Sequence, residues 1–163
     1  MDVHLEPLAL EHRAPMIDIF NYYIENSFAA YPDRKVPYEF FDRLLPSLEG
    51  YPAFVAEDEH KKVLGFGMLR AFLPFSVFAK TAEISYFIRP ESTRKGVGDR
   101  LLTSLIQKAE AKVIKNILAS ISSLNEPSIK FHLKNGFIEC GRLKNIGEKK
   151  GQLFDVVYMQ KML

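Results

Sequence analysis

The sequence predicts one mixed α/β sheet that is covered by helices on both of its faces. Its 163 residues are enough for one domain with a sizeable core, and we expect 1–163 to form that domain. Strand patterns and helix patterns follow one another without strict alternation, so neither a purely alternating βα chain nor an all-β fold fits. No internal repeat, low-complexity tract or glycine–serine linker interrupts the chain.

The first half of the chain carries the patterns of a strand, two helices and a hairpin. Residues 3–6 can form a short strand, and apolar residues between Leu8 and Ser27 recur at the spacing of one helix face. A proline-bracketed turn follows, and Tyr38 to Leu48 reads as a second helix. The apolar runs YPAFVAED and VLGFGMLRAF, separated by the charged turn EHKK, predict a β-hairpin.

The second half begins with FLPFSVFAK, an apolar stretch broken by Pro74 that is typical of a loop. An apolar stripe from Leu101 to Val113 predicts one long helix, and Gly136 is the stop signal of another. The expected elements are a strand at 81–88, the long helix, a strand in NILASIS, a helix at 126–135 and two closing strands in GFIECGRLKNI and GQLFDVVYMQKML.

Composition excludes several classes of protein. The net charge of +2 is close to balance and argues against a dedicated nucleic-acid binder. No stretch approaches the ~18 apolar residues of a membrane span, and the N-terminus does not resemble a signal peptide. The single cysteine, Cys140, excludes a disulfide framework and fits a reducing cytoplasm, where we expect the protein. No His/Cys/Asp/Glu cluster has metal spacing, so no metal is expected.

The stretch RKGVGDRLL, residues 94–102, places two glycines between a predicted strand and a predicted helix. Backbone N–H groups and the positive end of the helix dipole would both face an anion there, and glycine lets it approach closely. The alternative is an ordinary tight turn. The stretch is not a Rossmann fingerprint, because Leu101 stands at the third glycine position, and it is not a P-loop, because no GK[ST] follows.

The order of motifs along the chain resembles the GNAT superfamily of acetyl-CoA-dependent N-acyltransferases. The matching pieces are similar to its phosphinothricin and methionine-sulfoximine acetyltransferase branch, and they cover nearly the whole chain. They are IFNYYIENS, YPAFVAE, TAEIS, GVGDRLL, the N-x-x-S of NEPS, FHLKNGF and IGEKKGQLFDVVYMQ. The resemblance implies the GNAT fold, with a V-shaped opening between two central strands, and a homodimer.

The resemblance also implies how acetyl-CoA, as co-substrate, is held. The pantetheine arm would pair with the strand backbone near Phe87 and Ile88, and the pyrophosphate would rest on the glycine loop. Thr93 stands where the family has Gln or Arg, and Arg94 stands where glycine is common. The expected cofactor-binding residues are Phe87, Ile88, Thr93, Arg94, Lys95, Gly96, Val97, Gly98, Asp99, Arg100, Asn125 and Ser128.

Transfer of an acetyl group to an amine calls for a base more than for an acid. Neutralising an amine of pKa near ~10 at pH 7 costs roughly 4 kcal/mol, whereas protonating a thiolate of pKa near ~8.5 is worth about 2 kcal/mol. Glu83 is the candidate base, acting through a water, on a strand face shared with Thr81, Ser85 and Phe87. His132 is the candidate acid for the thiolate, with a helix-surface histidine as the alternative.

The acceptor side departs from the resembling branch, which carries arginines in the loop that corresponds to FLPFSVFAK. Leu73, Phe75 and Ala79 stand at those positions here, and an apolar loop holds a carboxylate poorly. We therefore expect a small amine of more apolar character, contacted by Asn21, Phe72, Phe75 and Thr81. The alternatives are that this loop fills a core or dimer interface, that the acceptor is a protein amine, or that the chain is a silent acyl-CoA-binding regulator.

Overall fold

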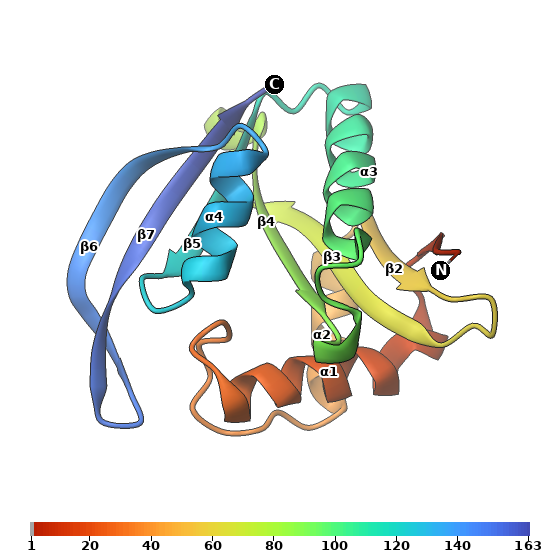
Figure 1. Ribbon diagram of the computed structural model, residues 1–163. Helices are drawn as coiled ribbons and strands as arrows, with labels where there is room; N and C mark the ends of the chain where they lie inside the picture. Colours follow the sequence, from red (N-terminus) through yellow and green to blue (C-terminus); the bar gives the residue numbers. More distant parts are fainter. Residues whose placement is uncertain (1) are drawn as a thin grey trace.

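The structure is a computed structural model that describes residues 2–163. In the described chain a seven-stranded sheet has the order β1-β2-β3-β4-β5-β7-β6 (Figure 1). All neighbouring strands are antiparallel except β4 and β5, so the sheet is mixed as predicted. The strands are β1 His4–Pro7, β2 Ala53–Glu57, β3 Val63–Ala71, β4 Thr81–Ile88, β5 Asn116–Ser122, β6 Ile138–Lys149 and β7 Gln152–Met162.

Two pairs of helices cover the two faces of the sheet, which confirms the predicted layers. Helices α1 (Arg13–Asn26) and α2 (Glu39–Ser47) enclose one core around Phe41 and Phe66. Helices α3 (Val97–Ala111) and α4 (Glu126–Lys134) cover the opposite face. Short 3-10 turns lie at Leu10–His12, Ser76–Phe78 and Pro90–Ser92.

The parallel pair β4 and β5 is joined over a short distance only. Thr81, Ala82 and Glu83 pair with Asn116, Ile117 and Leu118, and no pairing follows towards Ile88 in the described chain. Figure 1 shows the two strands diverging below this point, with α4 beside β5 and the start of α3 near the end of β4. The sheet is therefore continuous at one end of the pair and open at the other.

Alternation along β4 separates its side chains between the two helix layers. Phe87 packs in the core under α1 and α2, whereas Ile84 and Tyr86 belong to the core under α3 and α4. Glu83 and Ser85 share the face of Phe87, as the sequence predicted. The open end of the sheet thus connects two chemically different faces.

The closing hairpin is longer than the sequence indicated. β6 was expected to end near residue 146 but continues to Lys149, which pairs with Gln152. The two residues between them, Lys150 and Gly151, both have positive φ (54° and 72°), as in a type I′ turn. The last residues of β6, Gly147, Glu148 and Lys149, include no apolar side chain, so apolar alternation could not reveal this extension.

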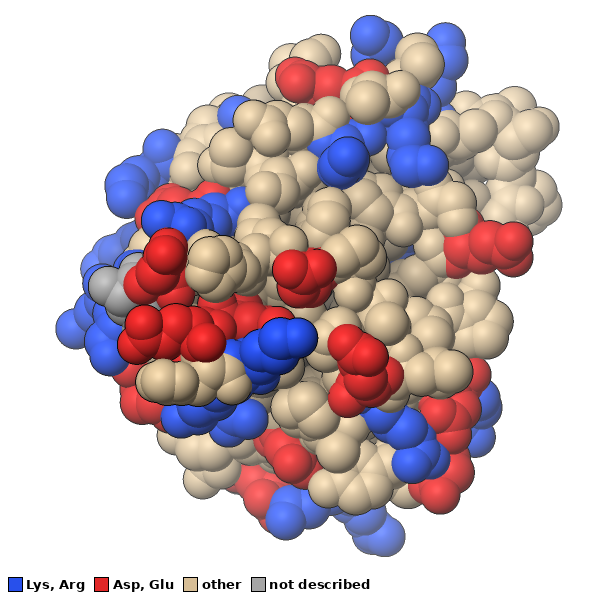
Figure 2. All heavy atoms as spheres, turned by 90° about the vertical axis from the view of Figure 1, so that its right-hand side faces the viewer, with Lys and Arg blue, Asp and Glu red and all other residues tan. Residues whose placement is uncertain are grey.

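The side of the molecule drawn in Figure 2 carries no dominant charged patch. There, basic and acidic side chains lie interspersed among uncharged ones. None of the helices in residues 2–163 is both long enough and apolar enough to cross a membrane.

The packing of α3 against the sheet yields a stability prediction. Leu105 is fully buried between α3 and the sheet, and its truncation leaves a cavity among packed side chains. We expect Leu105→Ala to lower the free energy of unfolding by about 2–5 kcal/mol in urea denaturation. The control Leu133→Ala removes a side chain that is 53% exposed and should change stability by less than about 0.5 kcal/mol. Equal losses in both variants would contradict this packing.

Candidate functional site

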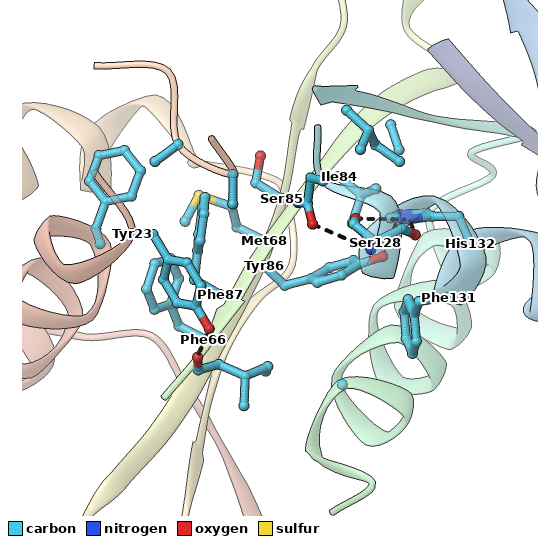
Figure 3. Close-up of a pocket in the computed structure, with 18 of the residues that line it drawn as sticks. Tyr23, Phe66, Met68, Ile84, Ser85, Tyr86, Phe87, Ser128, Phe131 and His132 are labelled. Carbon is cyan, nitrogen blue, oxygen red and sulfur yellow. Dashed lines mark hydrogen bonds between the residues drawn. The ribbon is translucent and has the colours of Figure 1, made fainter. Parts of the chain in front are cut away.

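A cavity of about 940 Å³ opens where β4 and β5 separate. Its walls come from α1, the α1–α2 loop, α2, β3, β4, the loop before α3 with the first turn of that helix, β5 and α4. Figure 3 shows Tyr23, Phe66 and Phe87 on one side of β4, and Tyr86 and His132 on the other. The cavity therefore reaches both faces of the sheet through its open end.

The glycine loop forms one end of this cavity. Gly96 is the N-cap of α3 with φ 80°, and Arg94 also has a positive φ of 60°. Among the hydrogen bonds of residues 2–163, none uses the N–H groups of residues 94–99; the first bond of the helix runs from Arg100 N–H to Gly96 C=O. Unused N–H groups at the start of a 15-residue helix are a cradle for an anion.

The side chains expected around this cradle divide into two groups. Arg94, Asp99 and Asn125 line the cavity, together with Thr93, Gly96, Gly98 and Ser128. Thr93 Oγ1 donates to Pro90 C=O at 2.8 Å, so its proton is already used. Asn125 caps α4, and its Oδ1 accepts from Ser128 N–H at 3.4 Å.

Three expected cofactor-binding side chains lie outside the cavity. Arg100 Nη1 donates to Val3 C=O at 2.7 Å, which turns its charge towards the N-terminal strand. The side chain of Val97 is buried in the core beneath β2 and β3. Lys95 is exposed and does not line the cavity. For Lys95 and Val97, the main chain alone belongs to the anion cradle.

The main chain of β4 corrects the predicted pairing at Phe87. Arg89 N–H donates to Leu64 C=O on β3, and in an antiparallel ladder alternate residues point to the same neighbour. Phe87 therefore pairs with Phe66, whereas the main-chain groups of Ile84, Tyr86 and Ile88 point towards the opening. The pairing of Glu83 with Leu118 uses Ile84 N–H, and Tyr23 Oη donates to Ile88 C=O. Ile84 C=O and both main-chain groups of Tyr86 therefore offer the free edge of the strand.

Glu83 lies at the closed end of the opening, on the α1/α2 face. Its Oε1 accepts from Arg70 Nη2 at 2.9 Å, and its side chain is 20% exposed. Ser85 follows on the same face, and Ser120 lies on β5, where its Oγ is 3.1 Å from Tyr31 Oη. A carboxylate beside hydroxyl groups can accept a proton from a bound molecule or from a water, and the ion pair with Arg70 holds it in position.

His132 lies on the opposite face, where the structure contradicts the helix-surface alternative. It is 3% exposed and packs edge-on against Phe137. Its Nδ1 lies 2.7 Å from Ser128 C=O, which accepts but cannot donate, so Nδ1 carries the proton. Nε2 is then the acceptor of the Tyr86 hydroxyl hydrogen. Burial lowers the pKa of His132 and raises that of Tyr86, so both are neutral near pH 7.

None of the four residues expected to contact an acceptor lines the cavity. Asn21 uses both ends of its amide on the backbone of Val36, at 3.0 and 2.8 Å. Phe72 and Phe75 belong to the β3–β4 loop, and Thr81 begins β4, at the paired end of the strand. The reason is topological, because β4 opens at its other end. Phe75 is 62% exposed, which also excludes a core role for it.

Two side chains that were not expected at the site, Tyr31 and Ser120, lie on the same face as Glu83. Tyr31 comes from the α1–α2 loop and Ser120 from β5, whereas Tyr86 lines the cavity on the opposite face of β4. Alternation in NILASIS put Ser120 on a polar strand face, which was the one available signal for it. No local pattern could indicate Tyr31, because its position depends on how a loop folds back. Among the described residues, no group of three His, Cys, Asp or Glu side chains is arranged to hold a metal ion.

Comparison with known proteins agrees with this geometry. The model of the "Acetyltransferase (GNAT) family" matches residues 16–137, three quarters of the chain and including β4, the glycine loop and α4. The chain belongs to the GNAT acetyltransferase family. Its predicted fold is thereby confirmed.

One relative and two solved structures are similar to the chain over most of its length. An L-methionine sulfoximine/L-methionine sulfone acetyltransferase of Pseudomonas paraeruginosa is 37% identical over 112 residues, which are 69% of this chain and 65% of that protein. The match thus spans less than two thirds of that relative. A phosphinothricin acetyltransferase from Sinorhizobium meliloti, solved with AcCoA, has a TM-score of 0.95 and 27% identity, covering 100% of this chain and 89% of that one.

A second solved structure carries a different description. The ribosomal-protein-alanine N-acetyltransferase from Brucella melitensis has a TM-score of 0.92 and 31% identity. The alignment covers 98% of this chain and 99% of that one. Similar folds in this family are thus described with both small-molecule and protein acceptors.

The burial of His132 yields a prediction about pH. Because its pKa is lowered in the folded state, the unfolded chain binds the proton more readily below the ordinary value of about 6.5. The contribution of His132 is therefore present above pH 6.5 and is lost as the pH falls below it. In urea denaturation from pH 7.5 to 5.5, we expect the wild type to lose more stability than His132→Asn. Parallel curves for the two proteins would contradict a neutral, buried imidazole.

Proposed function

We propose that the protein transfers the acetyl group of acetyl-CoA to the amine of a small molecule. The observation that carries this proposal is the placement of an anion cradle at residues 94–99 and a carboxylate, Glu83, at opposite ends of one cavity. Membership of the GNAT family and the similarity to acetyltransferases of amino-acid analogues support it.

The residues of the cavity fit the co-substrate. The N–H groups of residues 94–99 hold its pyrophosphate, with Arg94 adding charge at the rim. Ile84 C=O and the main-chain N–H and C=O of Tyr86, which lie beyond the pairing with β5, are placed to bond the amides of an extended arm. Bound acetyl-CoA supplies a thioester, and the open end of the sheet lets it reach the face on which Glu83 lies.

Glu83 removes the proton of the attacking amine, directly or through a water held by nearby hydroxyl groups. This proton is the larger obstacle, since neutralising an alkylamine at pH 7 costs roughly 4 kcal/mol. The ion pair with Arg70 holds the carboxylate at the end of the strand pairing. Arg70 is therefore a positioning residue for Glu83.

His132 does not act as the acid in this proposal. Its Nε2 accepts the Tyr86 hydroxyl hydrogen, and its Nδ1 proton is bonded to Ser128 C=O. A thiolate of pKa near ~8.5 can leave without an acid at a cost of about 2 kcal/mol at pH 7. The Tyr86–His132 pair instead joins β4 to α4 across the open end of the sheet.

A protein amine is the second candidate acceptor, which the similarity to the Brucella enzyme favours. The hydrogen bond between Tyr31 and Ser120 crosses the acceptor side of the cavity, which suits a small molecule better than a chain in an open groove. Release of free thiol from acetyl-CoA, with amine panels and N-terminal peptides in parallel, separates the two candidates. Activity with peptides alone would reject the small-molecule acceptor.

We further propose that the protein acts in the cytoplasm as a homodimer. Its single cysteine fits a reducing compartment. The β3–β4 loop exposes Phe75 and Val77, at 62% and 82%, and such apolar surface is typical of an interface. Sedimentation equilibrium of the wild type and of Val77→Asp tests the dimer.

The geometry of the glycine loop yields a prediction about cofactor binding. An alanine at Gly96 meets no atom within 4 Å but is strained at φ 80° by about 1–2 kcal/mol, so the free loop should relax to another conformation that acetyl-CoA binding must reverse. We expect Gly96→Ala to weaken acetyl-CoA binding about tenfold in calorimetry. Gly50→Ala is a matched control, because Gly50 has φ 83° with equal space but lies outside the cavity. Equal weakening in both variants would show that the loop is not the binding element.

The role of Glu83 as base yields a second prediction. Glu83→Gln keeps the shape of the side chain but removes the proton acceptor, so kcat should fall about 10²- to 10⁴-fold. The dissociation constant of acetyl-CoA should stay within about twofold, because the anion cradle is unchanged. Glu59→Gln, at a side chain 74% exposed, is the control for loss of one charge. Wild-type turnover in Glu83→Gln would remove Glu83 from the mechanism.

A further inference from the structure

Lys149 is a buried lysine that the proposed chemistry does not use. It is 4% exposed, and burial lowers its pKa. Its Nζ donates to Ser27 C=O at 2.9 Å and to Ala30 C=O at 2.8 Å, and it forms no ion pair within residues 2–163. A lysine buried against carbonyl groups alone is costly, so its position calls for an explanation.

The C-terminal end of α1 lacks a stop signal of its own. Its C-cap is Ser27 in extended conformation, and its last turn holds no basic residue. The carbonyl groups at a helix end need donors from elsewhere. Lys150 supplies one for Glu25 C=O, and Lys149 supplies one for Ser27 C=O. The tip of the β6–β7 hairpin therefore caps α1. Figure 1 shows this tip near the end of the helix.

The same hairpin also holds an aromatic ring against the loop that follows α1. Phe154 stacks on Tyr31, with centroids 6.0 Å apart and planes at 5°, and meets Phe28 at 6.2 Å. Gly147 pairs with Phe154 across the hairpin, and a Cβ there would lie 2.2 Å from the ring. The absence of a side chain at Gly147 gives Phe154 its room.

This loop is the acceptor wall of the cavity. Ala29, Ala30, Tyr31 and Pro32 line it, and Ala30 is 2% exposed beside the Lys149 ammonium. Tyr31 is half-exposed and bridges to Ser120 on β5. Because the loop contains no helix or strand, its shape depends on these contacts with the hairpin, and on the Asn21 clamp at its other end.

We infer that Lys149 is a positioning residue for the acceptor: it fixes the α1–α2 loop so that Tyr31 closes the acceptor side of the cavity and limits the size of the amine. The inference rests on the proposed acetyl transfer and adds the element that sets acceptor specificity. Lys149 itself touches no reacting group, since it does not line the cavity.

The test compares Lys149→Met with Lys144→Met, which removes an exposed lysine from the same strand. In Lys149→Met, the KM for a good amine should rise at least tenfold, while the dissociation constant of acetyl-CoA stays within twofold. Discrimination against bulkier amines of the same class should weaken. Lys144→Met should match the wild type. An unchanged amine KM, or an equal loss of acetyl-CoA affinity, would overturn the inference.

A double variant shows whether Lys149 acts through Tyr31. If it does, Lys149→Met should add little to the amine KM of Tyr31→Ala, because both changes remove the same wall. Additive effects would overturn this part of the inference. If Lys149→Met does not fold, Gly147→Ala is the substitute variant, because its Cβ would displace the Phe154 ring from the same loop.

Hydrogen exchange without any cofactor keeps this inference separate from the proposed function. In Lys149→Met, backbone amides of residues 27–36 should exchange faster than in the wild type, whereas those of α3 should not change. Unchanged exchange at 27–36 would overturn the inference. Absence of wild-type turnover with every amine would instead reject the proposed function.

Discussion

The pairing of β4 with β5 ends at Glu83 and Leu118, and the arrangement of the site follows from that end point. A parallel pair that continued to Ile88 would satisfy Ile84 C=O and the main chain of Tyr86 and would seal the sheet between its two faces. Because the strands separate instead, free main-chain groups line an opening. The glycine loop and the start of α4 lie beside it, since α3 follows β4 and α4 follows β5.

The two faces of the sheet divide the chemistry between them. Glu83, Ser120 and Tyr31 lie on the α1/α2 face, where an amine can approach, whereas Tyr86 and His132 lie on the face of α3 and α4. The charged base is thus kept apart from a buried, neutral pair. Because Glu83 lies on the other face, it does not offset the cost of burying a protonated imidazole under α3 and α4. The pKa of His132 is accordingly lowered.

The sequence was sufficient for the layers, the mixed sheet and most element boundaries, because apolar periodicity is imposed by burial. It also placed Glu83 on the correct face of β4, since alternation along a strand is a local property. It could not place the expected acceptor residues relative to the cavity, because their positions depend on which end of a strand pair opens and on where loops fold; the cavity lining includes none of Asn21, Phe72, Phe75 and Thr81.

The same limit applies to contacts between distant segments. Nothing local connects Lys149 with Ser27, or Tyr86 with His132, although each contact joins two elements of the site. The resemblance to a family favoured a pyrophosphate site over an ordinary turn at the glycine loop, and it supplied the candidate role of His132. It did not supply the hydrogen bonds that decide what His132 can do.

The central claim is that main-chain N–H groups at the start of α3 hold the pyrophosphate while the open sheet directs the thioester to Glu83. A crystal structure with coenzyme A and an unreactive amine analogue tests it most directly. We expect the pyrophosphate oxygens within hydrogen-bond distance of the N–H groups of residues 94–99, and the sulfur at the end of the opening nearest Glu83. A bound coenzyme outside the space between β4 and β5, with this loop vacant, would contradict the account.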